Sequence, residues 1–215
     1  ETTYDLAELA PRYGIGGFDL SETTDLTCAT LLFCVRGNPN IYVKQMYWIP
    51  EDLLEKRVHE DQIPYDIWEK KGWLRTSPGF RNDYRLILDW FVQEMEQDDI
   101  YLFKCGFDRW SAAYLVQAMQ ERFGENIMVP VAQGKQTLSG PMKNLAADMT
   151  AKRIIYDNNP ILKWCMANVA VDIDRNDNIQ PMKTSNPRKR IDGFASLLDA
   201  YAVYEQNKED YMNLI

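Results

Sequence analysis

Three aspartates stand where apolar segments of the chain end or begin. Asp19 lies at the close of a first apolar segment, Asp108 directly follows a later one, and Asp192 lies in the first turn of the last amphipathic segment. Because ligand sites in mixed sheets gather at strand ends, we expect these carboxylates to converge in the fold. Carboxylates without cysteine or histidine partners favour hard cations such as Mg²⁺ or Mn²⁺.

Two cations held by such carboxylates would support one kind of chemistry. Ions roughly 4 Å apart stabilise both the entering and the leaving oxygen of an in-line phosphoryl displacement and lower the pKa of an attacking water. Without cations the neighbouring carboxylates repel one another, so metal binding is expected to order the site and to release protons. Aspartate is also common in turns and helix caps, so these positions alone do not separate a catalytic site from ordinary structure.

The first part of the chain predicts an antiparallel meander. Apolar segments at 15–20 and 26–35 are separated by a polar stretch, which favours a hairpin. Turn residues at 37–40 then lead into a third apolar segment at 41–48. A helix is expected over 50–60, with proline and acidic residues in its first turn.

The rest of the chain alternates helical and extended segments after an excursion at 61–78. That excursion is rich in proline, glycine and tryptophan and is expected to be irregular. The expected helices cover 85–97, 110–123, 138–152, 158–168 and 191–204, the expected strands cover 100–107, 127–131 and 154–156, and 169–173 with 179–182 form an expected hairpin. The pattern predicts a single α/β domain over 1–215, in which a three-strand antiparallel meander joins parallel strands and helices cover both faces.

Composition limits the classes of protein that this chain can represent. With 215 residues and 46% hydrophobic content, the chain is long enough to bury a full core. A net charge of -8 argues against a protein that coats nucleic acid by bulk electrostatics, so any DNA contact must be local. The sequence has no apolar run long enough for a membrane helix.

Cysteine and histidine usage argues against a structural zinc site. The four cysteines, which are Cys28, Cys34, Cys105 and Cys165, show no CxxC spacing, and His59 is the only histidine. We therefore expect reduced, buried thiols in a cytosolic protein. Because the first residue is Glu1 and the start is unlike a signal peptide, we expect an excised domain.

The ordered set of motifs resembles the C-terminal nuclease domain of large terminase subunits from tailed phages or prophages. Three motifs cover 17–27, 106–110 and 190–193, and their acids are Asp19, Asp108 and Asp192. Segments at 130–134, 138–143 and 159–162 also match the family in order and spacing. The likeness extends over nearly the whole chain, and its specificity lies in the ordered set.

The resemblance implies a fold, an activity and partners. The fold would be ribonuclease H-like, and the activity would be cleavage of double-stranded concatemeric viral DNA during genome packaging, with two divalent cations, Mg²⁺ or Mn²⁺, at Asp19, Asp108 and Asp192. The portal and the small terminase subunit would be partners in the full-length motor, in the cytoplasm of the bacterial host. Large terminases also carry an ATPase, and because no GxxxxGK[ST] pattern occurs here, we expect that ATPase to be absent from this chain.

Basic residues precede the third motif and are candidates for DNA binding. Lys183, Arg188, Lys189 and Arg190 concentrate positive charge immediately before Asp192. Lysine and arginine hold phosphates without reading sequence, although a solvated basic loop has the same composition.

Weaker candidates surround these residues. Asp25 would assist a metal or act as a turn residue, and Arg109 would contact the scissile phosphate or pair with Asp108. Lys135 and Lys143, beside the loop at 133–134, are further phosphate candidates.

Three further expectations concern residues that we do not assign to the site. Asp199 lies two turns beyond Asp192 on the same helical face, and a surface acid is the simpler expectation. His59 is expected to be exposed and inert. Most of the six tryptophans are expected in the core, because base stacking requires exposed rings and unpaired bases.

Three functional alternatives remain open. The first hairpin also resembles the phosphate-binding hairpin of actin-like ATPases and sugar kinases, although Ser21 stands where those proteins have glycine and the chain is short for their two lobes. The second alternative is a non-catalytic docking module of the packaging motor, for which the 61–78 excursion would supply a surface. A resolvase or transposase would share the acids but not the order of the motifs.

Overall fold

The central feature of the computed structural model, which describes residues 3–21, 24–110, 113–186 and 188–215, is a mixed sheet. Within these residues the strand order is β4-β3-β2-β1-β5-β6, and β7 pairs with β3. The strands are β1 (Tyr13–Asp19), β2 (Thr27–Cys34), β3 (Ile41–Pro50), β4 (Leu74–Ser77), β5 (Tyr101–Asp108), β6 (Met128–Val131) and β7 (Ile154–Ile155). β1, β2 and β3 form the expected antiparallel meander, whereas β5 and β6 extend the sheet in parallel.

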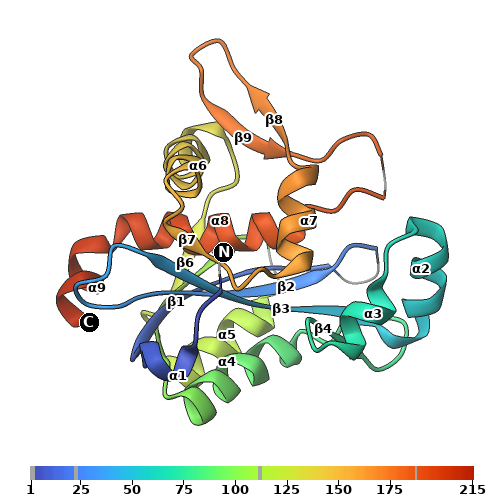
Figure 1. Ribbon diagram of the computed structural model, residues 1–215, viewed down its shortest axis with the longest axis horizontal. Coiled ribbons are helices and arrows are strands. Elements are labelled where there is room, and N and C mark those ends of the chain that lie inside the picture. Colours follow the sequence, from blue (N-terminus) through green and yellow to red (C-terminus); the bar gives the residue numbers. More distant parts are fainter. Residues whose placement is uncertain (1–2, 22–23, 111–112, 187) are drawn as a thin grey trace.

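Helices cover both faces of this sheet, which confirms the predicted α/β architecture. The helices are α1 (Leu6–Leu9), α2 (Leu54–Asp61), which follows the 3-10 turn η1 (Glu51–Leu53), α3 (Tyr65–Lys70), α4 (Arg85–Asp98), α5 (Ala113–Phe123), α6 (Lys135–Thr150), α7 (Pro160–Asn168), α8 (Asp192–Gln206) and α9 (Lys208–Leu214). In Figure 1, α6, α7 and α8 lie on one side of the sheet, and α4 and α5 lie on the other. The short α1 and the terminal α9 were not anticipated from the sequence.

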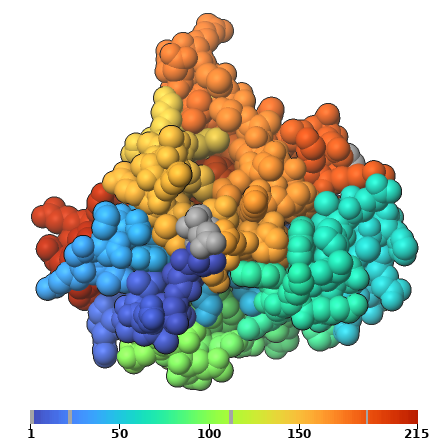
Figure 2. Space-filling model, viewed as in Figure 1, coloured from blue at the N-terminus to red at the C-terminus, as the bar shows by residue number. Residues whose placement is uncertain are grey.

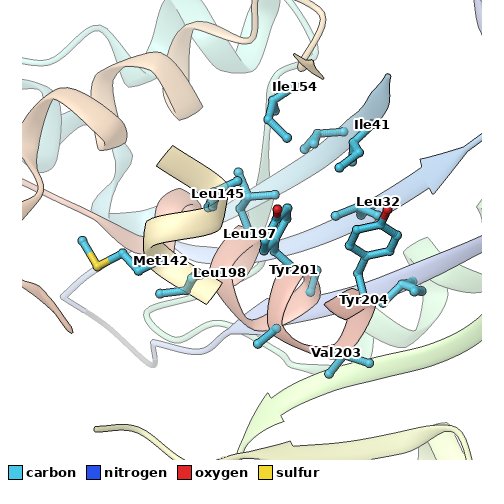
Figure 3. Close-up of a cluster of buried hydrophobic side chains, with 14 of the residues drawn as sticks. Leu32, Ile41, Met142, Leu145, Ile154, Leu197, Leu198, Tyr201, Val203 and Tyr204 are labelled. Atoms are coloured by element: carbon cyan, nitrogen blue, oxygen red, sulfur yellow. The ribbon is translucent and has the colours of Figure 1, made fainter. Parts of the chain in front are cut away.

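The core explains why the central strands read as continuous apolar runs. Every residue of β2 is buried, because the strand is covered on both faces. On the α8 face, Leu197 and Tyr201 pack with Leu32 of β2 and Leu145 of α6 (Figure 3). On the opposite face, Phe18 joins a second cluster that includes residues of α4 and α5. All four cysteines are buried free thiols, as expected.

The excursion at 61–78 is more regular than the sequence suggested. It contains α3 and β4, and β4 pairs in parallel with the end of β3 from Tyr47 to Pro50. Tyr65 and Trp68 of this segment pack against Trp164 of α7. A four-residue edge strand of mixed polarity gives little periodic signal, which is why the expectation of an irregular segment was wrong.

The last expected hairpin is confirmed as β8 (Ala170–Ile173) and β9 (Ile179–Met182), which form a separate two-stranded sheet. This hairpin projects beyond α6 at the top of the molecule (Figures 1 and 2). Lys135 pairs with Asp172 at 2.8 Å, and Lys143 donates to the carbonyl of Asp177 at 2.7 Å. Both lysines therefore attach the hairpin to α6.

No helix among the described residues is long and apolar enough to cross a membrane.

Candidate metal centre

Strand register places Asp19 and Asp108 side by side. Phe18 of β1 pairs with Phe107 of β5, and the next residue on each strand is an aspartate. Adjacent strands lie roughly 4.8 Å apart, so the two acids leave the same edge of the sheet. Since Phe18 and Phe107 stack within the cluster on the α4 and α5 face, the alternation of side chains directs both aspartates to the α8 face.

Two glycines allow α8 to approach these strands closely. A Cβ atom at Gly17 would lie 2.6 Å from the backbone nitrogen of Ala200 and 2.6 Å from the carbonyl oxygen of Ser196. A Cβ atom at Gly106 would lie 2.6 Å from the carbonyl oxygen of Asp199. Any larger residue at either position would displace the helix. The glycines therefore fix α8 against the strands that carry Asp19 and Asp108.

The first turn of α8 places Asp192 in the interior, where its side chain is only 2% exposed. Burial raises the pKa of Asp192 to about 7, and the charge of Asp25 adds to this shift. Burial also raises the pKa of Asp19 well above its usual value, and Asp192 and Asp199 raise it further. These causes show that Asp19, Asp192 and Asp199 share one electrostatic environment.

Asp199 is a member of this group that sequence reasoning assigned to the surface. It is 5% exposed, and Gln133 donates a hydrogen bond to its Oδ1 at 3.0 Å. Burial raises the pKa of Asp199 to about 7, with a further contribution from Asp108. The seven-residue spacing from Asp192 was the available signal, but the depth of the helix, which depends on Gly17 and Gly106, was not visible in the sequence.

The acids provide the oxygen donors that hard cations prefer, and one donor oxygen has no partner. Oδ2 of Asp192 is buried without a hydrogen bond among the described residues. A buried carboxylate oxygen without a partner is costly, and a divalent cation would satisfy it. Within those same residues, no three acidic, histidine or cysteine side chains converge into a ready-made cation site. The expected acids therefore share a region rather than a completed coordination sphere.

A chain of ion pairs borders the acids. Arg190 Nη1 lies 2.6 Å from Asp25 Oδ1, and Arg190 Nη2 lies 3.0 Å from Asp61 Oδ2. Lys183 also pairs with Asp25, and its Nζ lies 3.8 Å from Asp192 Oδ1. Although burial opposes the effect, Lys183 and Arg190 hold the pKa of Asp25 below its usual value.

The basic candidates for DNA binding fall into different environments. Arg188 and Lys189 are exposed, whereas the side chain of Arg190 is 5% exposed and enclosed by its two ion pairs. Arg190 therefore has a structural role in these two ion pairs, and its expected phosphate contact stays a prediction. Lys135 and Lys143 are likewise engaged by the β8–β9 hairpin. Pro187, which interrupts this basic segment of the sequence, lies outside the described residues.

The remaining candidates have simple surroundings. Arg109 is exposed, and no ion pair in the described part of the chain joins it to Asp108. Asp108 instead accepts a hydrogen bond from the backbone N–H of Trp110 at 3.2 Å. Trp110 is 85% exposed, in contrast to the buried Trp48, Trp68 and Trp90. His59 is exposed, as expected.

Comparison with known proteins places this arrangement in a family. The model of the family described as the terminase large subunit, endonuclease domain, matches residues 2–208. The chain belongs to this family. Membership confirms the resemblance seen in the ordered motifs and favours it over the likeness to actin-like ATPases and sugar kinases.

Individual relatives agree with the family assignment. The chain is 28% identical over 191 residues to the terminase large subunit of Enterobacteria phage HK97, a match that covers 87% of this chain and 36% of that protein. The chain thus spans well under half the length of this relative. The crystal structure of the HK97 bacteriophage large terminase superposes with a TM-score of 0.79 at 26% identity, covering 92% of this chain and 42% of that chain.

More distant solved structures share the fold. The large terminase nuclease domain of bacteriophage SPP1 superposes with a TM-score of 0.54 at 13% identity, covering 95% of this chain and 92% of that chain. The large terminase nuclease of thermophilic phage G20c gives a TM-score of 0.52 at 14% identity, covering 88% of this chain and 80% of that chain. The expected ribonuclease H-like mixed sheet is therefore confirmed.

Proposed function

We propose that this chain is a metal-dependent endonuclease domain that cleaves double-stranded concatemeric viral DNA during genome packaging. The observation that carries the proposal is a buried group of acids on the α8 face, which consists of Asp19, Asp192 and Asp199. The chain that carries this group belongs to the terminase endonuclease family. The SPP1 nuclease domain was solved with bound Mn, and the G20c nuclease with bound magnesium. These structures support a divalent cation as the cofactor proposed for this chain.

Asp19, Asp108 and Asp192 are the proposed metal ligands, and Asp199 is added as a fourth carboxylate. Two divalent cations, Mg²⁺ or Mn²⁺, would supply Lewis acidity at the scissile phosphate and a more acidic water when bound. Raised pKa values keep the buried carboxyls partly protonated near neutral pH, so cation binding would exchange protons for metal. Gln133 engages only Oδ1 of Asp199, which leaves the other oxygen for a proton or a cation.

Other residues would hold the DNA backbone. Arg188 and Lys189 are exposed shortly before Asp192 and are the preferred phosphate contacts, with Arg109 beside Asp108 as a weaker one. Asp25 is proposed to orient the basic residues rather than a cation, because it already binds Lys183 and Arg190. Such local contacts suit a chain whose net charge is -8.

The larger context follows from the family. We take residues 1–215 as one nuclease domain that would act with an ATPase, the portal and the small terminase subunit, in the cytoplasm of the bacterial host. A docking role without catalysis is the competing interpretation. It predicts partner binding that does not depend on the acids.

Nicking of supercoiled plasmid tests the proposal. With Mn²⁺ the parent protein is expected to convert plasmid to open-circular and linear forms, and Asp19→Ala is expected to abolish conversion, because a ligand of the reacting centre is lost. Asp210→Ala removes an exposed acid on α9 and serves as the matched control, with parental nicking expected. Circular dichroism establishes that each variant is folded. If folded Asp19→Ala nicks plasmid as well as the parent protein does, the proposal is refuted. If the parent protein does not nick plasmid and Asp19→Ala still binds a partner, the docking role is favoured.

A further inference from the structure

Lys183 reaches from the end of β9 into the group of acids. Its ammonium group pairs with Asp25, lies 3.8 Å from Asp192 Oδ1 and interacts electrostatically with Asp19. Lys183 therefore places one positive charge beside two of the proposed metal ligands. Oδ1 of Asp192 faces this charge, whereas Oδ2 is buried without a hydrogen-bond partner in the part of the chain that the structure describes.

We propose that Lys183 is a built-in counter-cation, which occupies the acid group until a divalent ion displaces it. The inference rests on the proposed function. A divalent ion bound to Asp192 and Asp19 would stand close to the ammonium group, and two positive charges at such short range repel. Binding of the metal is thus coupled to release of Lys183 from Asp192 and Asp25.

Arg190 and Lys183, which both pair with Asp25, differ in how readily they can release this carboxylate. Arg190 is 5% exposed and holds Asp25 and Asp61 with separate nitrogens, so its departure would break two ion pairs at once. Lys183 is 46% exposed and has a flexible side chain that ends in a single charged group. A partly exposed lysine pair is weak, so a divalent ion can displace it.

Release would give Lys183 a second role. Its position directly after β9 keeps the free ammonium group tethered beside the proposed reaction centre, where a DNA phosphate is the available anion. Lys183 would then balance carboxylate charge before metal binding and phosphate charge afterwards. It is a positioning residue in this scheme, because it does not ligate the metal.

Calorimetric titration with Mn²⁺ alone, at pH 8.5 and low ionic strength, tests the inference without measuring cleavage. Lys183→Met keeps most of the side-chain length and removes the charge, and it is expected to bind Mn²⁺ roughly fivefold more tightly than the parent, in line with the loss of a weak competing ion pair. Lys183→Arg retains the charge and is expected to restore near-parental affinity. Lys152→Met is the matched control: Lys152 is exposed near β7, at the opposite end of the sheet from Asp19, and the variant should keep parental affinity.

The outcomes separate this inference from the proposed function. Equal or weaker Mn²⁺ binding by folded Lys183→Met, with clear binding by the parent, would overturn the role of Lys183 and leave the metal centre intact. Absence of Mn²⁺ binding by the parent and by every variant would overturn both. Tighter binding by Lys152→Met as well would show that general charge, rather than the position of Lys183, controls affinity, and would also overturn the inference.

Discussion

At the scale of single residues, burial of Asp199 links stability to pH. Its pKa of about 7 lies above the usual value of 3.8 because burial disfavours the charged form. Below about pH 4 the carboxyl is protonated in the folded and the unfolded chain, so its burial does not lower the free energy of unfolding. Between about pH 4 and pH 7 the unfolded chain loses this proton first, and the folded state is progressively destabilised.

Asp199→Asn is therefore expected to be more stable than the parent at pH 8, by about 2 kcal/mol, and equal to it near pH 4. Urea unfolding at both pH values measures the difference. Asp210→Asn, an exposed control, should shift stability by less than about 0.5 kcal/mol at either pH. A parental or lower stability of Asp199→Asn at pH 8 would contradict the burial argument.

Arg190 provides the second test at this scale. Because it bridges Asp25 and Asp61 with a side chain that is 5% exposed, Arg190→Met would leave two acids without their buried partner. The expected loss of unfolding free energy is about 3 kcal/mol, against less than about 0.5 kcal/mol for the exposed Arg188→Met. Equal losses in chemical denaturation would show that the buried bridge has no special structural role.

At the scale of elements, the close approach of α8 to β1 and β5 determines where Asp192 and Asp199 lie. Gly17→Ala would place a Cβ atom 2.6 Å from backbone atoms of that helix, so the helix must shift. We expect a loss of about 3 kcal/mol in unfolding free energy from this overpacking. Gly134→Ala, where a Cβ atom meets nothing within 4 Å, should cost at most about 1 kcal/mol. Comparable thermal shifts for the two variants would contradict the close approach.

The same helix shows which features of the fold can be predicted from the sequence alone and which cannot. Periodicity predicted α8, and apolar runs predicted β1 and β5, because burial on both faces leaves a strong local pattern. The depth of α8 against Gly17 and Gly106 comes from tertiary packing, which has no periodic signature. For that reason Asp199 was expected at the surface, and the burial of Arg190 beside Asp25 and Asp61 was not predicted.

At the scale of the whole molecule, a net charge of -8 requires the proposed DNA binding to depend on a few local contacts. Binding of duplex DNA should weaken linearly with the logarithm of salt concentration. Replacing both Arg188 and Lys189 with alanine is expected to lower that slope by about 2, because two phosphate contacts are lost. The matched double variant at Lys152 and Lys208 should leave the slope unchanged, and fluorescence anisotropy across a salt series measures it. Unchanged slopes in both would remove Arg188 and Lys189 from the interface.

The most direct test of the central claim is anomalous diffraction from crystals soaked in Mn²⁺. The account predicts manganese peaks coordinated by Asp19 and Asp192, with Asp108 or Asp199 completing the ligand set, and movement of Lys183 away from Asp192. Manganese bound only at other surfaces, with Asp19 and Asp192 unligated, would contradict the proposed metal centre.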